Sequence, residues 1–309
     1  MPFAKFTSLC CCAAALVVHA QQRDTVKAVS QNPSPMVEYT RQHERIPLHE
    51  YEGTKFEVAQ LFAKPVEVFI PRKSRKARTL DVLWHFHGAN YLVQHAAAQY
   101  RGNLAAISIN LGSGSSVYGR AFEDATKFTA ALDSILFQLE RHLGHAVQPG
   151  KIILSGFSAG YGAVRKILST QSNFARVDAV LLLDGLHASY IPEGKVLAEG
   201  GVIDSTGLAA FMRFASNAAR RESTKQLLIT HSEIFPGTFV STTEASNFIL
   251  QALGMKREAV LKWGPLGMQQ LSVARRGRFE VQGFAGNTAP DHIDHLHAVK
   301  EFLRRLREL

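Results

Sequence analysis

Apolar residues recur along the chain in two patterns. Some segments have the apolar runs or alternation of strands, and others have the three-to-four-residue spacing of helices. Strand-like runs cover 56–62, 66–70, 80–86, 104–110, 152–154, 177–183, 226–230 and 279–284. Helix-like spacing covers 91–101, 122–143, 161–169, 208–221, 243–253 and 291–309. Strands that alternate with helices predict the α/β class, with a mostly parallel twisted sheet and helices on both faces. The first two strands are expected to form an antiparallel pair.

The N-terminal stretch has a different pattern, typical of an export signal. Lys5 precedes an apolar segment, and Val18 and Ala20 are small residues at the two positions that a signal peptidase reads. The segment is too short to span a bilayer comfortably, although an uncleaved anchor is the alternative. We therefore expect a signal peptide over 1–20, an extended polar lead-in over 21–50 and one α/β domain over 51–309.

Cysteine usage bears on where the protein acts. All three cysteines, at positions 10–12, lie inside the predicted signal peptide. A mature chain without cysteine has no disulfide, no thiol nucleophile and no cysteine metal site. An exported protein without disulfides favours a bacterial periplasm or the extracellular space.

The charge balance argues against nucleic acid as a partner. The chain has 309 residues, of which 46% are hydrophobic and 20% charged, and its formal net charge is +9. Its basic residues are scattered apart from 72–78 and 304–307, and neither cluster is interleaved with aromatic residues. We expect a globular protein that has no nucleic-acid partner and no stable membrane span after signal cleavage.

One short motif stands between a strand and a helix. The apolar run 152–154 leads into Gly156-Phe157-Ser158-Ala159-Gly160, and helix-like sequence follows. A sharp strand-to-helix turn needs glycine two residues before and after its apex, where a side chain would collide with the neighbouring strand or helix. Ser158 is therefore a candidate nucleophile.

Other reactive side chains follow the remaining predicted strands, where groups at one edge of a parallel sheet gather. These strand ends carry His85, His87, Gly88, Ala89, Asn90, Asp184, His231, Glu233, Asp291, His292, His295 and His297. The set contains a serine nucleophile, an acid and a late histidine, in that order along the chain.

At this point the chain resembles the α/β-hydrolase superfamily, over about 56–309. The resemblance is carried by the motif around Ser158, the His87-Gly88 pair after the third predicted strand, and the histidine-bearing loop after the last strand. It implies that the serine attacks a carbonyl, a histidine takes its proton and a carboxylate orients the histidine. It also implies an oxyanion hole made by the backbone N–H groups of Ala89 and Ala159.

The resemblance leaves the base and the acid open. His292, at the start of the final helix, is favoured as the base, with His295 as the alternative. Asp184 directly follows a buried strand and is favoured as the acid, because a short carboxylate there is held rigidly. Glu233 occupies the more usual place for the acid and is its alternative.

Two rival functions use the same residues. His85 and His87 are two apart on a strand, so with Asp291, His292 and His295 they suggest a metal-dependent hydrolase. That interpretation leaves the glycines around Ser158 unexplained. The second rival is a catalytically inactive hydrolase-like binding module.

The sequence thus predicts an exported serine hydrolase, namely a carboxylic-ester hydrolase that needs no cofactor or metal. Its substrate would be a small-molecule or polymer-borne ester. The segment 188–225, between two predicted strands, is long enough for a small cap over the site.

Overall fold

The computed structural model describes residues 43–309. The predicted signal peptide and most of the predicted lead-in lie outside these residues. None of the helices within them has the length and apolar character needed to cross a membrane.

A 10-stranded sheet forms the centre of the described chain, with strand order β1-β2-β4-β3-β5-β6-β9-β12-β11-β10. Its strands are β1 (Gly53–Val58), β2 (Val66–Pro71), β3 (Thr79–Phe86), β4 (Leu104–Ile109), β5 (Gln148–Phe157), β6 (Ala179–Leu183), β9 (Gln226–His231), β10 (Glu258–Trp263), β11 (Gln269–Arg276) and β12 (Phe279–Phe284). The strands from β4 through β3, β5, β6 and β9 to β12 are parallel, and both edges are antiparallel. This order, with the serine turn directly after β5, gives the chain an α/β-hydrolase fold and confirms the predicted class.

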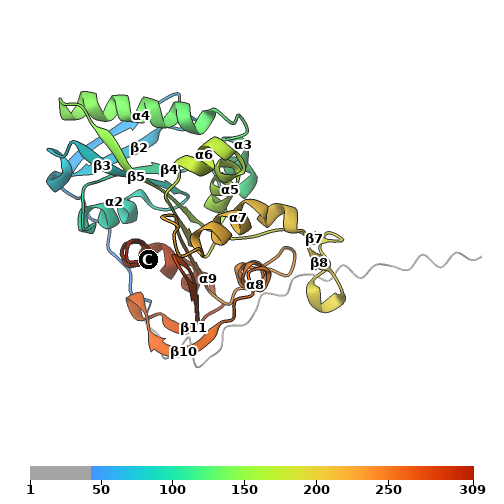
Figure 1. The fold of residues 1–309 in the computed structure, drawn as a ribbon. Helices are drawn as coiled ribbons and strands as arrows, with labels where there is room; N and C mark the ends of the chain where they lie inside the picture. The colour runs from blue at the N-terminus through green and yellow to red at the C-terminus, as the bar shows by residue number, and fades with distance from the viewer. Residues whose placement is uncertain (1–42) are drawn as a thin grey trace, which may run out of the picture.

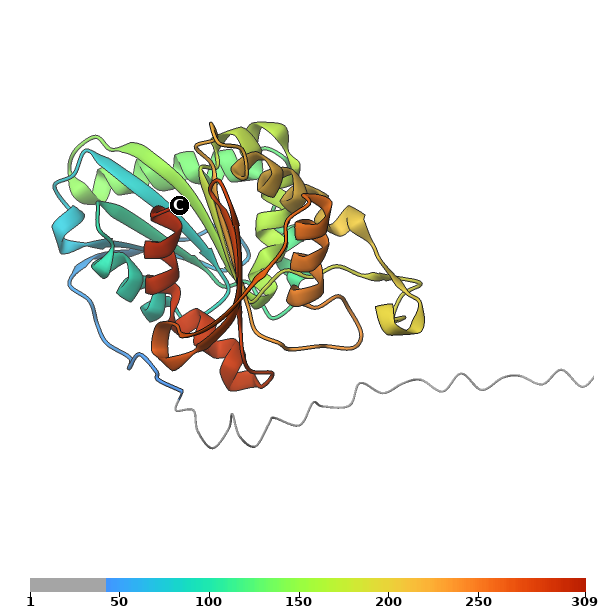
Figure 2. The same ribbon diagram turned by 60° about the horizontal axis from the view of Figure 1, so that its bottom comes forward.

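Helices cover both faces of the sheet (Figures 1 and 2). One face carries α3 (Ser115–Arg120), α4 (Lys127–Leu143), α5 (Tyr161–Ser169), α6 (Gln171–Arg176), α7 (Ala209–Ala218) and α8 (Thr242–Ala252). The other face carries α2 (Asn90–Gln99), α9 (Ala289–His297) and α10 (Val299–Arg307). The predicted final helix is therefore two helices, which meet at Ala298.

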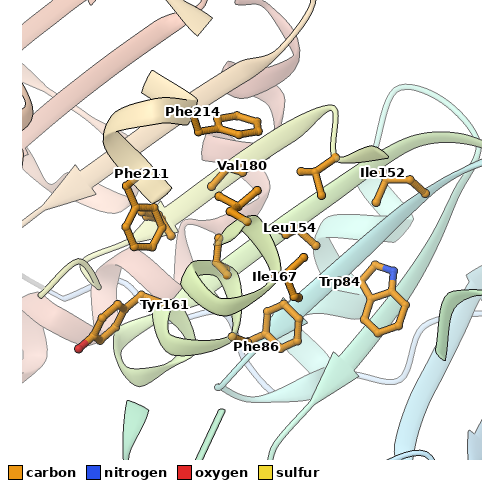
Figure 3. Close-up of a cluster of buried hydrophobic side chains, with 14 of the residues drawn as sticks. Trp84, Phe86, Ile152, Leu154, Tyr161, Ile167, Val180, Phe211 and Phe214 are labelled. Carbon is orange, nitrogen blue, oxygen red and sulfur yellow. The ribbon is translucent and has the colours of Figure 1, made fainter. Parts of the chain in front are cut away.

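Alternating side chains of the strands build a separate core on each face. Trp84 and Phe86 of β3, Leu154 of β5 and Phe211 and Phe214 of α7 lie in the larger core (Figure 3). Intervening strand positions face α2 and α10 in a second core. Burial of each large apolar side chain contributes roughly 2 kcal/mol, so both faces hold the central strands in register.

The chain between β6 and β9 contains the segment 188–225, for which a small cap was predicted. It contains the two-stranded ribbon β7 (Tyr190–Ile191) and β8 (Val202–Ile203), which projects from the body in Figure 1. The segment also contains two short 3-10 helices, Leu197–Glu199 and Ser205–Leu208, and α7, whose Phe211 and Phe214 are buried against the sheet. Because α7 belongs to the core, only the ribbon and its flanking loops are left to cover the site.

The pair β10 and β11 was not among the predicted strands. All but one residue of β10 are exposed, and β11 is mostly polar. β10 has no buried face, and of β11 only Gln270 and Ala274 are buried, so neither strand carries the alternating apolar pattern that a buried face imposes.

Candidate active site

The turn after β5 holds Ser158 in a strained backbone conformation. Its φ is 47°, in the left-handed region that residues other than glycine rarely adopt. A Cβ at Gly160 would lie 2.0 Å from the carbonyl oxygen of Phe86 on the neighbouring strand β3. Such strain costs about 1–3 kcal/mol and is typical of functional sites. The glycine allows the turn to pack against β3, and Ser158 stands at the edge of the sheet where parallel strands end.

The end of β6 brings Asp184 next to this turn. Asp184 also has a positive φ, of 41°. The following residue, Gly185, approaches the serine backbone so closely that a Cβ there would lie 2.4 Å from the Ser158 carbonyl oxygen. Asp184 and Ser158 thus belong to one tightly packed unit made by two neighbouring strands.

Asp184 is a buried carboxylate with three hydrogen-bond donors among the described residues. Its Oδ2 lies 2.7 Å from Nδ1 of His292 and 2.6 Å from Oγ of Ser232, and its Oδ1 accepts the backbone N–H of Ser232 at 3.0 Å. Burial alone would raise the pKa of Asp184. The hydrogen bond from His292, the attraction that His295 and His292 exert when they are protonated, and the hydrogen bond from Ser232 outweigh burial and hold this pKa well below its usual range. Asp184 is therefore ionised at neutral pH.

An ionised Asp184 determines which nitrogen of His292 carries the proton. A carboxylate only accepts hydrogen bonds, so Nδ1 of His292 must donate and the neutral ring keeps a lone pair on Nε2. The His292 side chain is 24% exposed, and its ring lies against Phe157, directly before the serine, with 4.6 Å between ring centroids. Among the described residues no hydrogen bond joins His292 to Ser158; such contacts often tighten only when substrate binds.

The alternative acid and base lie in different surroundings. Glu233 is exposed, and its carboxylate accepts the backbone N–H of Gly286 at 3.3 Å. His295 is fully buried, where its Nδ1 hydrogen-bonds Oγ1 of Thr230 at 2.9 Å and its ring stacks on Phe302. The structure brings together Asp184 and His292, the pair that sequence favoured.

The predicted oxyanion donors begin two helices. Ala89 is the N-cap of α2, and Ala159 follows Ser158 in the turn that runs into α5. N–H groups in the first turn of a helix have no partner within that helix, so they can bind an anion. The neighbouring N–H of Gly88 is occupied, since it donates to Oδ1 of Asn110 at 2.9 Å.

The predicted His85–His87 pair does not face a common point. His85 is buried and both its ring nitrogens are engaged, with Oγ of Ser155 and the carbonyl of His87, each at 3.0 Å. The φ of His87 is 69°, which takes it out of the strand, and its Nδ1 hydrogen-bonds the hydroxyl of Tyr118. Burial lowers the pKa of His85 to about 4. The structure therefore does not assemble the metal site that sequence spacing suggested.

A different group of possible metal ligands lies beside α9. Atoms of His43, Asp291 and Asp294 lie within 4.8 Å of one another in the described part of the chain. Asp294, however, pairs with both His43 and Arg45, and Asp291 caps the first turn of α9 through Thr288. Through these contacts the two carboxylates hold α9 in place, and α9 is the helix that carries His292.

A cavity of about 470 Å³ opens beside Ser158. It is lined by Ser113, Ser115, Ser158, Ala159, Tyr161, Arg165, His187, Ala188, Ser189 and Phe239. A larger hollow of about 710 Å³ lies between α2 and α10 and shares no lining residue with it. The smaller cavity is the one that contains Ser158 and Ala159.

Two residues that support the site were not singled out from the sequence. Ser232 follows β9 and binds both oxygens of Asp184, and Asn110 follows β4 and holds the loop that contains Ala89. Both lie at strand ends, which was the available signal. Small polar residues are common at such places, so only their contacts distinguish them.

The sequence matches no family model. It also matches no curated protein.

Several solved structures are similar to this chain. A thermostable esterase is 11% identical with a TM-score of 0.47, and the alignment covers 83% of this chain but only 62% of that one. Est1E from Butyrivibrio proteoclasticus is 11% identical with a TM-score of 0.41, over 84% of this chain and 100% of that one. Poly(aspartic acid) hydrolase-1 from Sphingomonas sp. KT-1 is 13% identical with a TM-score of 0.45, over 83% and 100%. At such identities a likeness concerns the fold alone.

Proposed function

We propose that this protein is a serine hydrolase that cleaves carboxylic esters. Ser158 is the nucleophile, His292 is the base, and Asp184 is the carboxylate that orients His292. The observation that carries the proposal is the 2.7 Å hydrogen bond between Asp184 and His292 beside the strained Ser158 turn. Together, these three residue types form the arrangement that activates a serine hydroxyl.

The first half of the reaction forms an acyl-enzyme. Oγ of Ser158 attacks the ester carbonyl carbon as Nε2 of His292 accepts its proton. The imidazolium that results is stabilised by the buried, ionised Asp184. When the tetrahedral intermediate collapses, the carbon–oxygen bond to the alcohol breaks and His292 gives the proton to the departing oxygen.

The negative charge of the tetrahedral intermediate falls on the former carbonyl oxygen. In this proposal the N–H groups of Ala89 and Ala159 receive it, at the starts of α2 and α5. A donor of this kind is worth roughly 3 kcal/mol in the transition state. Water then attacks the acyl-enzyme with His292 again as base, and Ser158 leaves with its proton restored.

Covalent labelling with a fluorophosphonate probe tests the proposal. We expect the probe to label the purified wild-type protein, with or without a chelator, and to fail with Ser158→Ala. Ser155→Ala is a matched control, because this serine precedes the turn on the same strand and is buried. That variant should keep its labelling provided that its melting temperature shows it to be folded.

Other outcomes would contradict the proposal. Ester hydrolysis that a chelator abolishes, in a protein that the probe does not label, would indicate metal chemistry. Absence of both labelling and turnover in a folded protein would indicate a binding module.

A further inference from the structure

The pocket beside Ser158 contains a cation that the proposed chemistry does not use. Arg165 is the only formally charged side chain among the described residues that line this cavity. It is half-buried. The remaining lining consists of hydroxyl groups, small apolar groups, two aromatic rings and His187. A lone arginine in such a pocket is suited to bind an anionic group of a ligand.

Helix geometry directs Arg165 towards the serine. Tyr161 and Arg165 are three and seven residues beyond Ser158, so the three share one face of the turn and helix that follow it. Side chains of a helix lean towards its N-terminus, which here is the Ser158 end. The guanidinium of Arg165 accordingly lies over the Tyr161 ring, 5.4 Å from its centroid.

Arg165 has no carboxylate partner within 4 Å in the described part of the chain. The nearby Asp204 uses its Oδ1 to accept both the backbone N–H and the hydroxyl of Thr206. The hydrogen bonds from Thr206 lower the pKa of Asp204, and the charge of Arg165 adds to this effect at longer range. By contrast, Lys166, the next residue of α5, is paired with Glu123. The guanidinium of Arg165 is therefore available to a ligand.

The rest of the pocket offers neutral polar contacts. Nδ1 of His187 donates to the carbonyl of Val240 at 2.9 Å, which leaves its Nε2 as an acceptor. Burial lowers the pKa of His187, so the ring is neutral at neutral pH and does not compete with Arg165 for an anion. Ser115 and Ser189 add hydroxyl groups.

On the basis that Ser158 is the nucleophile, we propose that Arg165 makes this hydrolase selective for esters that carry a carboxylate. A guanidinium binds a carboxylate through two parallel hydrogen bonds, which gives both affinity and orientation. Seven helical residues correspond to roughly 10 Å along the axis, and the long side chain of Arg165 reaches back over part of this distance. The carboxylate of the substrate therefore lies a few carbon atoms from the ester carbonyl, on its acyl or its alcohol side.

Two pairs of synthetic esters test this inference. Mono-4-nitrophenyl adipate and 4-nitrophenyl hexanoate differ by a carboxylate on the acyl side. The butyrate ester of 4-hydroxybenzoate and phenyl butyrate differ by one on the alcohol side. We expect kcat/KM to favour the carboxylated ester by about 10- to 100-fold in one pair, the effect of a charge-assisted hydrogen bond.

Variants of Arg165 show whether this side chain causes the preference. Arg165→Gln should abolish the preference. Arg165→Lys should retain part of it, because lysine keeps the positive charge but cannot form the two parallel hydrogen bonds of a guanidinium.

Lys166→Gln is the matched control, because it removes the same charge from the adjacent position outside the pocket. Lys166→Gln should leave kcat/KM unchanged for all four esters. Equal kcat/KM for both members of both pairs in the wild type would overturn the inference and leave the proposed function standing. A preference that persists in Arg165→Gln would also overturn it. Absence of any ester hydrolysis and of fluorophosphonate labelling would overturn the proposed function, and this inference with it.

Discussion

Two neighbouring strand ends each present a carboxylate near the site, and they differ in what surrounds it. After β6, Asp184 is buried and is held by Ser232 and His292. After β9, Glu233 is exposed, and its contact is with the backbone of Gly286 in the loop after β12. The carboxylate with the shorter side chain is the one that contacts His292.

The two strand ends are in contact, because Ser232, which follows β9, donates hydrogen bonds to Asp184, which follows β6. Ser232 directly precedes Glu233 in sequence, and its N–H and hydroxyl bind the two oxygens of Asp184. The loop after β9 therefore contributes to the candidate site through Ser232 and not through Glu233. One strand end can thus orient a side chain that the neighbouring strand end supplies.

Replacing Asp184 and Glu233 in turn should give the largest difference in kcat between the two strand ends. Asp184→Asn keeps the shape of the side chain but can donate to His292 and so favour the wrong tautomer. We expect kcat to fall by about 10⁴-fold. Glu233→Gln should lower kcat by less than about 10-fold, since it alters an exposed hydrogen bond. Ester hydrolysis by the two purified variants gives the comparison, and a larger loss in Glu233→Gln would reverse the assignment of the acid.

Removing the hydroxyl of Ser232 should have a smaller effect. Ser232→Ala leaves the backbone N–H on Asp184 but removes the 2.6 Å hydrogen bond to Oδ2. We expect kcat to fall by about 10-fold with KM unchanged, because orientation of His292 matters in the transition state.

Ser232→Thr keeps the hydroxyl and serves as the control. It should restore most of the lost kcat. A change confined to melting temperature, with kcat intact in Ser232→Ala, would show that Ser232 supports the fold and not the reaction.

A further prediction concerns His231, at the end of β9, and the pH dependence of stability instead of the reaction. Burial, together with the charge of Arg257, lowers the pKa of His231 from 6.5 to about 4. The unfolded chain binds this proton more readily than the folded one, so its contribution to stability is intact above pH 6.5 and is lost as the pH falls towards about 4. Loss of this contribution corresponds to roughly 2 to 4 kcal/mol.

Thermal unfolding between about pH 7 and pH 4 measures this effect. The melting temperature of the wild type should fall as pH decreases, and that of His231→Gln should fall less steeply. Parallel curves would show that His231 does not titrate differently on unfolding.

Much of the fold could be predicted because burial imposes a pattern on the sequence. The central strands β3, β5, β6 and β9 are buried on both faces and appear as apolar runs. The exposed β10 leaves no such mark, so its pairing with β11 becomes visible only in the assembled sheet.

The two histidines of α9 show the same limit at the scale of single residues. His292 and His295 are three residues apart, close to one helical turn, and nothing in their spacing ranks them. His292 reaches Asp184, whereas His295 packs against Thr230 and Phe302 in the core. Helix periodicity separates the faces of a helix, but it does not show which partner each face will meet.

By itself, the sequence determined the serine turn, since glycines at 156 and 160 between an apolar strand and a helix have a local steric reason. It also determined the order of the central apolar strands along the chain, and so the set of residues at their ends. Only the tertiary structure decided that Asp184 meets His292, that Ser232 supports Asp184, and that Arg165 lines a cavity together with Ser158 and residues of distant segments. These contacts join residues far apart in sequence or depend on side-chain direction, and both are decided when the strands and helices pack together.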